Sequence, residues 1–226
     1  MSLVNNSPSK NYLIIVPIFN GEKYIRCFYD RVLENYRPAL LFIDDGSTDR
    51  TSTILKSIGC RFVTHGVNWG KGAALLTGMD IARIRGIENI VVLDVDLQHP
   101  PELIGKFLEF KTGEMQIAYR RDRKTMPLHR KLSNFLTSLF ITVRTNTVIK
   151  DSQCGFRAFP VRLGLSQKIG AAGFQYESEL LLKAALSGYR IVHREIPVIY
   201  DDEPSQMNNV TDTLKFMILW FRSFFW

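Results

Sequence analysis

Short apolar segments alternate with segments of helical character along the first half of the chain, and this order limits the fold more than any single motif does. Runs rich in β-branched and aromatic residues predict strands at residues 12–16 (ended by Pro17), 39–43, 61–63, 90–93 and 115–119. Helical patterns lie between them at residues 21–35, 47–58 and 72–85, and another begins at 100–101. The alternation predicts a mainly parallel, doubly wound α/β sheet flanked by helices, which binds ligands at the carboxyl ends of its strands.

Asp94 and Asp96 follow the strand predicted at residues 90–93. Residues two apart in a strand point to the same face, so this strand end would present both carboxylates together. Hard cations such as Mg²⁺ bind carboxylate oxygens together with the phosphates of a substrate. Most aspartate pairs with this spacing are solvated turns, so the pair predicts a metal site only with support from elsewhere in the chain.

Polar residues at other strand ends provide that support. Asp44 and Asp45 close the strand predicted at 39–43, and Lys71 lies between two glycines before the helix predicted at 72–85. Acidic groups and a lysine at one rim of a sheet suit a nucleotide that carries a diphosphate and a metal, although a Gly-Lys-Gly loop alone is most often a plain turn. The spacing of a Walker A loop is absent, and so is a Gly-x-Gly-x-x-Gly sequence after the first strand, which counts against an NAD enzyme.

Length, charge and cysteine content narrow the setting. The 226 residues suit one large domain, and the net charge of +7 favours anionic partners. No known nucleic-acid-binding motif is visible, so we expect no nucleic acid. Three cysteines without metal-type spacing predict a reducing compartment. No signal peptide and no run of ~20 apolar residues is visible, which predicts a cytoplasmic protein, peripheral on the cytosolic face of a membrane if it binds one.

Several motifs occur in an order and spacing that are specific as a set: Val16-Pro17-Ile18-Phe19-Asn20-Gly21-Glu22, Asp44-Asp45-Gly46-Ser47-Thr48-Asp49, Gly70-Lys71-Gly72, Asp94-Val95-Asp96-Leu97-Gln98-His99-Pro100 and Asp151-Ser152-Gln153-Cys154-Gly155-Phe156-Arg157. With them, the chain resembles the family 2 glycosyltransferases of GT-A fold, and among these the branch that acts on polyprenyl and dolichyl phosphates. The resemblance implies a polar tail at 1–10, a GT-A catalytic domain at 11–200, and a linker with an apolar, amphipathic C-terminal helix at 201–226.

The same resemblance implies roles for individual residues. The nucleotide sugar would be bound by Pro17, Phe19, Glu22, Asp45, Lys71 and Asp94. The cofactor, Mg²⁺ or Mn²⁺, would be held by Asp94, Asp96 and Gln98. The acceptor phosphate would be bound by Arg120, Arg130, Ser133 and Arg157, and the catalytic residues would be Asp96, Arg120 and Asp151. The acceptor side departs from the family pattern, because Ala118-Tyr119-Arg120 replaces Gly-Ser-Arg and because Arg130 and Ser133 are three rather than four positions apart.

The implied reaction moves a hexose from a nucleotide-diphosphate sugar, of the UDP-glucose or GDP-mannose class, to a polyprenyl or dolichyl phosphate. A phosphate acceptor is already anionic, so we expect direct attack with inversion and no dedicated general base. One alternative is transfer to a sugar hydroxyl in polysaccharide or lipopolysaccharide assembly, for which Asp151 or Glu177 could serve as the catalytic carboxylate. Another is a non-catalytic module that binds nucleotide sugars.

Glu177 and Glu179 lie on a helix predicted at residues 176–186. Residues two apart on a helix do not face each other. We therefore expect Glu177 to reach the site, as the family resemblance implies, and Glu179 to lie on a solvated face.

Two segments have features of a membrane surface. A basic stretch at residues 120–131 precedes an amphipathic segment at 132–140, for which an anionic membrane and ordinary core packing are equal alternatives. The tail at 214–226 is apolar all round but too short to span a bilayer. We prefer interfacial anchoring for this tail; the alternative is docking on the protein's own body or on a second copy in a homo-oligomer.

Overall fold

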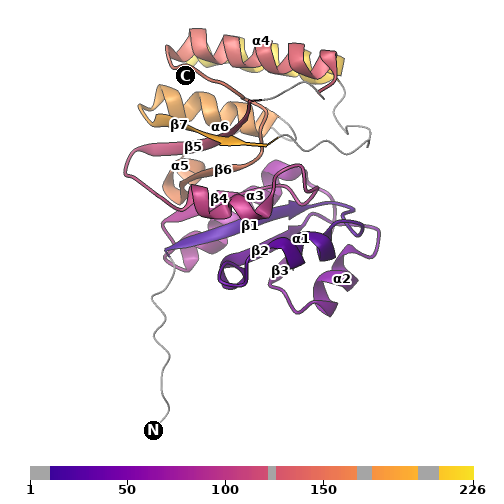
Figure 1. Cartoon of the computed structure of the whole chain (residues 1–226). Helices are drawn as coiled ribbons and strands as arrows, with labels where there is room; N and C mark the ends of the chain where they lie inside the picture. Colours follow the sequence, from indigo (N-terminus) through magenta and orange to yellow (C-terminus); the bar gives the residue numbers. More distant parts are fainter. Residues whose placement is uncertain (1–10, 122–125, 167–174, 198–208) are drawn as a thin grey trace.

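The described part of the chain folds around one seven-stranded sheet, shown in the computed structural model of Figure 1. The structure describes residues 11–121, 126–166, 175–197 and 209–226. In the strand order β3-β2-β1-β4-β6-β5-β7, β6 is antiparallel to both neighbours and the other pairs are parallel. The strands are β1 (Tyr12–Ile18), β2 (Leu40–Asp44), β3 (Phe62–Thr64), β4 (Asn89–Val92), β5 (Glu114–Arg120), β6 (Arg157–Pro160) and β7 (Arg190–Ile196).

Helices cover both faces of the sheet, because successive strand residues point to opposite sides. In β1, Leu13 and Ile15 belong to one apolar core with α3, α5, α6 and α7, whereas Ile14 and Val16 belong to a second core with α1, α2 and η2. The predicted mainly parallel α/β sheet flanked by helices is therefore confirmed. The helices are α1 (Ile25–Arg31), α2 (Thr51–Ser57), α3 (Lys71–Ile84), α4 (Leu128–Thr145), α5 (Val161–Ser166), α6 (Gln175–Leu186) and α7 (Asn209–Arg222), with 3₁₀ turns η1 (Arg37–Ala39), η2 (Pro101–Phe107) and η3 (Ser223–Phe225).

The prediction that Pro17 ends the first strand is wrong, because β1 continues to Ile18. The carbonyl of Ile15 accepts from the amide of Leu93 on the β4 side, so the nitrogen of Pro17, two residues on, points the same way. Pairing of β1 with β4 stops at Ile15, and the proline nitrogen therefore faces a place where no ladder bond is lost.

Helix α1 is shorter than the pattern at residues 21–35 predicts. The backbone amides of Asn20, Gly21 and Glu22 donate to side chains of the β2–α2 loop and of the first residue of α2, at 2.9 Å, 2.9 Å and 3.1 Å, and not to carbonyls of a helical turn. Asn20 also has a positive φ of 52°, which a right-handed helix excludes. These bonds delay the start of α1 to Ile25 and tie the β1–α1 loop to the neighbouring strand end.

His193 in β7 makes the stability of the fold depend on pH. Burial, with a contribution from Lys150, lowers the pKa of His193 from 6.5 to about 4. The folded state disfavours protonation, so the stability that neutral His193 provides is complete above pH 6.5 and is lost as the pH falls toward about 4. We expect chemical unfolding to show this loss in the unaltered protein and less of it in His193→Gln. The two proteins should differ in the slope of the free energy of unfolding against pH. This difference in slope should stay below about 1.4 kcal/mol per pH unit, the limit for one proton, since the ring is partly exposed. Parallel pH profiles for the two proteins would contradict this prediction.

Candidate active site

The predicted nucleotide-binding residues lie at one edge of the sheet. Pro17 is buried within β1, and Phe19, just beyond the strand, is 39% exposed. Glu22 accepts hydrogen bonds from the backbone and side chain of Arg50 at 3.0 and 3.2 Å. Asp45 is buried and lies directly after β2. The carboxyl ends of β1 and β2 therefore bring these four residues to the same edge, where doubly wound sheets bind ligands.

The loop that follows β4 carries the two aspartates. Leu97 has a positive φ of 61°, an uncommon conformation for a residue with a Cβ. This turn lets the amide of Gln98 donate to Asp96 Oδ1 at 3.1 Å. Strained backbone of this kind clusters at functional sites. The local bond fixes Asp96 in the loop beside Asp94.

Lys71, at the start of α3, joins Asp94 to a carboxylate from a distant helix. Its Nζ lies 2.6 Å from Asp94 Oδ1 and 2.5 Å from Glu177 Oε1 of α6. Gly155 lies against this pair, and a Cβ at its position would overlap the Asp94 carboxylate. The prediction that Glu177 reaches the site thus agrees with its position beside Lys71 in the structure.

The charged groups at this site differ in how burial and their neighbours shift their pKa values. Burial alone would lower the pKa of Lys71, but Asp94 and Glu177 outweigh it and raise the pKa above its ordinary value. Burial opposes ionisation of Asp94, yet the charge of Lys71 holds its pKa below the usual range. For Asp96, burial raises the pKa and the charge of Asp94 adds to the shift. An added cation would therefore relieve the charge of Asp96 most.

Asp94 and Asp96 suit a divalent cation whose remaining ligands come from the substrate. They supply hard oxygen donors, and Mg²⁺ is commonly bound by one or two carboxylates plus substrate phosphates. No group of three or more His, Cys, Asp or Glu side chains among the described residues is placed to hold a metal alone. In addition, the buried Nδ1 of His99 has no hydrogen-bond partner in the described structure and lies 3.9 Å from Asp94 Oδ2. An unsatisfied polar atom beside the carboxylates fits a site that takes a polar ligand.

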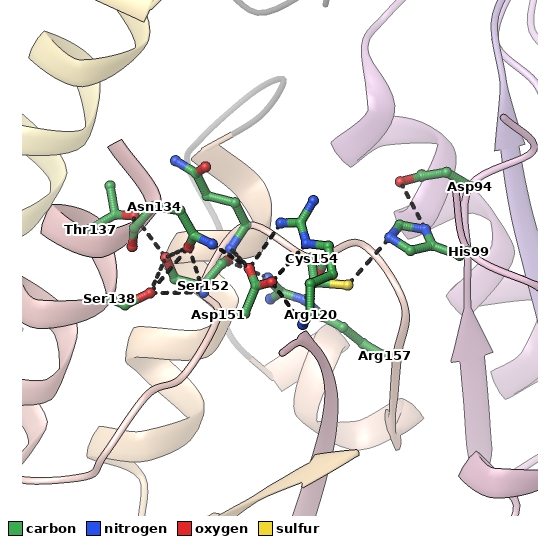
Figure 2. Close-up of polar contacts among 11 residues, drawn as sticks. Asp94, His99, Arg120, Asn134, Thr137, Ser138, Asp151, Ser152, Cys154 and Arg157 are labelled. Atoms are coloured by element: carbon green, nitrogen blue, oxygen red, sulfur yellow. Dashed lines mark hydrogen bonds and ion pairs between the residues drawn. The ribbon is translucent and has the colours of Figure 1, made fainter. Parts of the chain in front are cut away.

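Figure 2 shows that the segment at residues 151–157 connects the aspartate loop to the acceptor side. His99 Nε2 lies 3.3 Å from the Sγ of Cys154. Burial lowers the pKa of His99 despite the nearby aspartates, so its ring is neutral near pH 7. Burial raises the pKa of Cys154 to about 12, so this thiol is not a nucleophile. The pair holds the two loops together.

In the region predicted to bind the acceptor, Arg120 and Asp151 form a bidentate ion pair. Asp151 is fully buried, and its oxygens accept from Nε and Nη2 of Arg120 at 2.8 and 3.0 Å. Asn134 of α4 also donates to Asp151, at 2.8 Å. Ser138 and Ser152 extend this network through buried hydrogen bonds (Figure 2). A guanidinium fixed in this way is oriented before any anion arrives.

The other residues predicted to bind the acceptor phosphate differ in how deeply they are buried. Arg157 is 1% exposed, and its three nitrogens donate to the carbonyls of residues 152, 154 and 177 at 2.7, 2.9 and 2.5 Å. These three bonds use one donor on each nitrogen of Arg157, so its buried guanidinium supports the backbone of the site. Ser133 accepts from the side chain of Gln153 at 3.0 Å, and Arg130 lies one turn earlier on α4. Arg123 and Lys124 of the basic stretch lie outside the described residues.

Sequence patterns missed the polar face of α4 and misplaced one glutamate. Asn134, Thr137 and Ser138 are buried in the network, and their helical spacing was the signal available. The prediction that Glu179 is solvated is wrong: it is 4% exposed and pairs with Lys183 at 2.7 Å. Pairing with a residue one turn away on the same helix compensates its burial.

Both the sequence and the fold of this chain are similar to those of known glycosyltransferases. A model of the family described as glycosyl transferase family 2 matches residues 13–163. An uncharacterized protein of Methanocaldococcus jannaschii is 33% identical over 207 residues, which cover 84% of this chain and 89% of that protein. A UDP-N-acetylglucosamine–dolichyl-phosphate N-acetylglucosaminyltransferase of Methanococcus voltae is 27% identical and covers 84% of this chain and 86% of its own length.

Among solved structures, glucosyl-3-phosphoglycerate synthase from Mycobacterium tuberculosis, in complex with Mn²⁺, UDP and phosphoglyceric acid, superposes with a TM-score of 0.67. It is 21% identical, and the match covers 92% of this chain and 74% of that one. The likeness confirms the predicted GT-A fold, including the helices that flank the sheet.

Proposed function

The chain belongs to glycosyl transferase family 2, and on that premise we propose that it moves a hexose from a nucleotide-diphosphate sugar to a polyprenyl or dolichyl phosphate. Transfer to a hydroxyl would need a carboxylate that is available as a general base. The two candidates for that role, Asp151 and Glu177, are buried and ion-paired with Arg120 and Lys71. This observation favours an acceptor that is already anionic, and the dolichyl-phosphate enzyme of Methanococcus voltae acts on such a lipid.

At the donor end, Asp94 and Asp96 would hold Mg²⁺ or Mn²⁺, with Gln98 beside them. The metal would act as a Lewis acid toward the leaving diphosphate. Lys71 adds a cation at the same place, since its ammonium already lies beside Asp94. The Mn²⁺ and UDP bound by the structurally similar synthase support a divalent cation here without selecting between magnesium and manganese.

At the acceptor end, Arg120 would bind the lipid phosphate. Its bidentate pairing with Asp151 holds the guanidinium in one orientation, and the network of α4 holds Asp151. Preorganised cations stabilise charge in a transition state without reorganisation during the reaction. The phosphate oxygen would attack the anomeric carbon directly, the bond to the nucleoside diphosphate would break, and the configuration would invert.

A donor panel tests this function. The protein is incubated with UDP- and GDP-hexoses, Mg²⁺ or Mn²⁺, and undecaprenyl or dolichyl phosphate, and release of nucleoside diphosphate is measured. We expect release that requires the lipid phosphate, and a product of inverted anomeric configuration. A product of retained configuration would contradict the mechanism. Transfer to a sugar hydroxyl instead of the lipid would support the polysaccharide alternative, and binding without transfer would support a nucleotide-sugar-binding module.

Helix α4 supports placement of the enzyme at a membrane surface. Its apolar residues at helical spacing point outward, with Leu132, Phe135 and Leu139 exposed by 59%, 58% and 42%. Its buried face carries the polar side chains of Asn134 and Ser138 together with apolar Ile141. A helix that buries polar groups and exposes apolar ones needs another apolar phase or partner on its outer side. Core packing therefore does not account for its exposed stripe.

Helix α7 lies beside α4 at the end of the molecule away from α2 (Figure 1). One face docks on the body, through buried Phe216 and Leu219, while Ile218 and Phe221 are 60% and 58% exposed. The inner face of α7 therefore docks on the protein's own body, and its outer face is left available for a membrane surface. No helix in the described ranges has the length and apolar character to cross a bilayer. We propose peripheral binding on the cytosolic face through the outer surfaces of α4 and α7.

Replacing Leu132 and Phe135 together by serine should weaken binding to vesicles of phosphatidylcholine with phosphatidylglycerol. Losing the transfer of two exposed apolar side chains from water to the membrane predicts at least about a tenfold weaker partition. Ile84→Ser is the matched control, because Ile84 is 75% exposed and lies on α3, outside α4 and α7. Vesicle sedimentation measures the effect. Unchanged partition of the double variant, together with a shift from dimer to monomer in ultracentrifugation, would identify a homo-oligomer interface instead.

A further inference from the structure

Trp69 is a large aromatic residue that the donor edge of the sheet holds open to solvent. It lies in the loop between β3 and α3, and 63% of its surface is exposed. A single exposed apolar side chain is ordinary on a protein surface. Trp69 differs from such residues because hydrogen bonds to buried side chains fix the loop that carries it.

Asp45 fixes the backbone on which Trp69 is carried. Its Oδ1 accepts from the amide of Trp69 at 3.1 Å, and its Oδ2 accepts from the amide of Gly70 at 2.7 Å. The Nδ1 of His65 lies 2.7 Å from the same carboxylate. Because Asp45 is 3% exposed, these are contacts of a buried carboxylate, which hold the loop in one geometry.

The loop is braced from two further directions. His65 Nε2 lies 3.0 Å from Thr77 Oγ1 of α3, which ties the loop to the helix that begins with Lys71. Gly46 packs so closely against this loop that a Cβ at its position would overlap the backbone of Val67. The imidazole of His65 lies 5.1 Å from the indole ring, with 35° between the planes. The indole is therefore supported on a buried ring while much of its surface stays exposed.

The position of Trp69 matches one end of a nucleotide. Lys71, two residues later, reaches Asp94, where the diphosphate and metal are proposed to lie. In a nucleoside diphosphate, one ribose separates the base from the phosphates, so the base must lie a short distance from Lys71. Phe19 is exposed at the same edge, and register pairs Ile18 with Asp44, which places Phe19 next to Asp45. The loop of Trp69 is anchored on that same Asp45.

We propose that the indole of Trp69 is the platform on which the base of the donor nucleotide stacks; this inference rests on the proposed function. Every base has a π face, so stacking is tolerant of base identity. Trp69 then supplies affinity for a uracil or a guanine nucleotide and does not choose between them. Burying the exposed indole against the base also removes apolar surface from water.

Trp69→Ala and Trp69→Phe test the platform in the full-length protein, with Trp226→Phe as the control. We expect Trp69→Ala to raise the Kd for UDP or GDP roughly 10- to 100-fold, and Trp69→Phe to raise it less. Inorganic diphosphate, which has no base, should bind all variants alike. Nucleotide should quench tryptophan fluorescence in the unaltered protein and in Trp226→Phe, and this quenching should be lost in Trp69→Phe.

The outcomes separate this inference from the proposed function. Unchanged UDP and GDP affinity in Trp69→Ala, with sugar transfer intact, would overturn the platform and leave the function standing. Equal weakening of inorganic diphosphate and of nucleotide would also overturn it, because it would indicate a disturbed loop and not a lost stacking contact. Failure of the unaltered protein to bind either nucleotide would overturn both proposals.

Discussion

An Asp96→Asn enzyme is expected to transfer sugar about 1,000-fold more slowly than the unaltered protein, a loss equivalent to about 4 kcal/mol of transition-state stabilisation. Lys71 already neutralises much of the charge of Asp94, whereas burial and Asp94 raise the pKa of Asp96. Asp96 therefore has the most to gain from a divalent cation. Asparagine keeps the side-chain oxygen that accepts from the amide of Gln98, so the loop should keep its shape.

Single-turnover transfer and Mn²⁺ binding by electron paramagnetic resonance, with nucleoside diphosphate present, measure the two effects. Both should weaken in Asp96→Asn. Asp80→Asn is the matched control, because Asp80 is half exposed on α3 and pairs with Arg83. If Asp96→Asn loses transfer and still binds Mn²⁺ with unchanged affinity, Asp96 acts on the substrate and is not a metal ligand.

The placement of the proposed donor residues at one edge of the sheet could be predicted from sequence, because these residues follow strand ends. Strands that run parallel bring Asp45 and Asp94 to one edge whatever the details of packing, and Lys71 begins the intervening helix. The partner of Lys71 was harder to find. Glu177 arrives from α6, far along the chain, and periodicity alone says which helix face it occupies but not what that face meets.

The proposed acceptor side could not be predicted in the same detail, because the buried face of α4 carries polar side chains beside apolar Ile141. Apolar spacing at Leu132, Leu136 and Phe140 is compatible with a helix buried on that face, yet Leu132 is exposed. What decides the orientation is the hydrogen bonding of Asn134 and Ser138 to the segment at 151–157. That segment continues into β6, a strand too short and too polar at its start to be recognised beforehand.

The segment at 151–157 joins both halves of the site, and Arg157 holds it. Asp151 orients Arg120, Cys154 contacts His99, and Gly155 lies against Asp94. The guanidinium of Arg157 binds the carbonyls of residues 152 and 154 within the segment and of residue 177 on α6. Burial lowers its pKa, although Glu177 and Asp151 oppose the shift. One side chain thus binds three backbone carbonyls between the carboxylates proposed for the donor and the arginine proposed for the acceptor.

Arg157→Met is consequently expected to cost about 3 kcal/mol or more of the free energy of unfolding, because it leaves buried carbonyls unsatisfied. For a domain of this size the melting temperature should fall by roughly 6–12 °C. Arg157→Lys should rescue little, since one ammonium cannot reproduce the planar fork of donors. Arg162→Met is the matched control, because Arg162 is exposed on α5 and its loss should change stability by less than about 0.5 kcal/mol. Calorimetry on the four proteins measures the difference. A melting temperature of Arg157→Met equal to that of the control would mean that the buried guanidinium does not hold the segment, and that the other contacts of residues 151–157 position it.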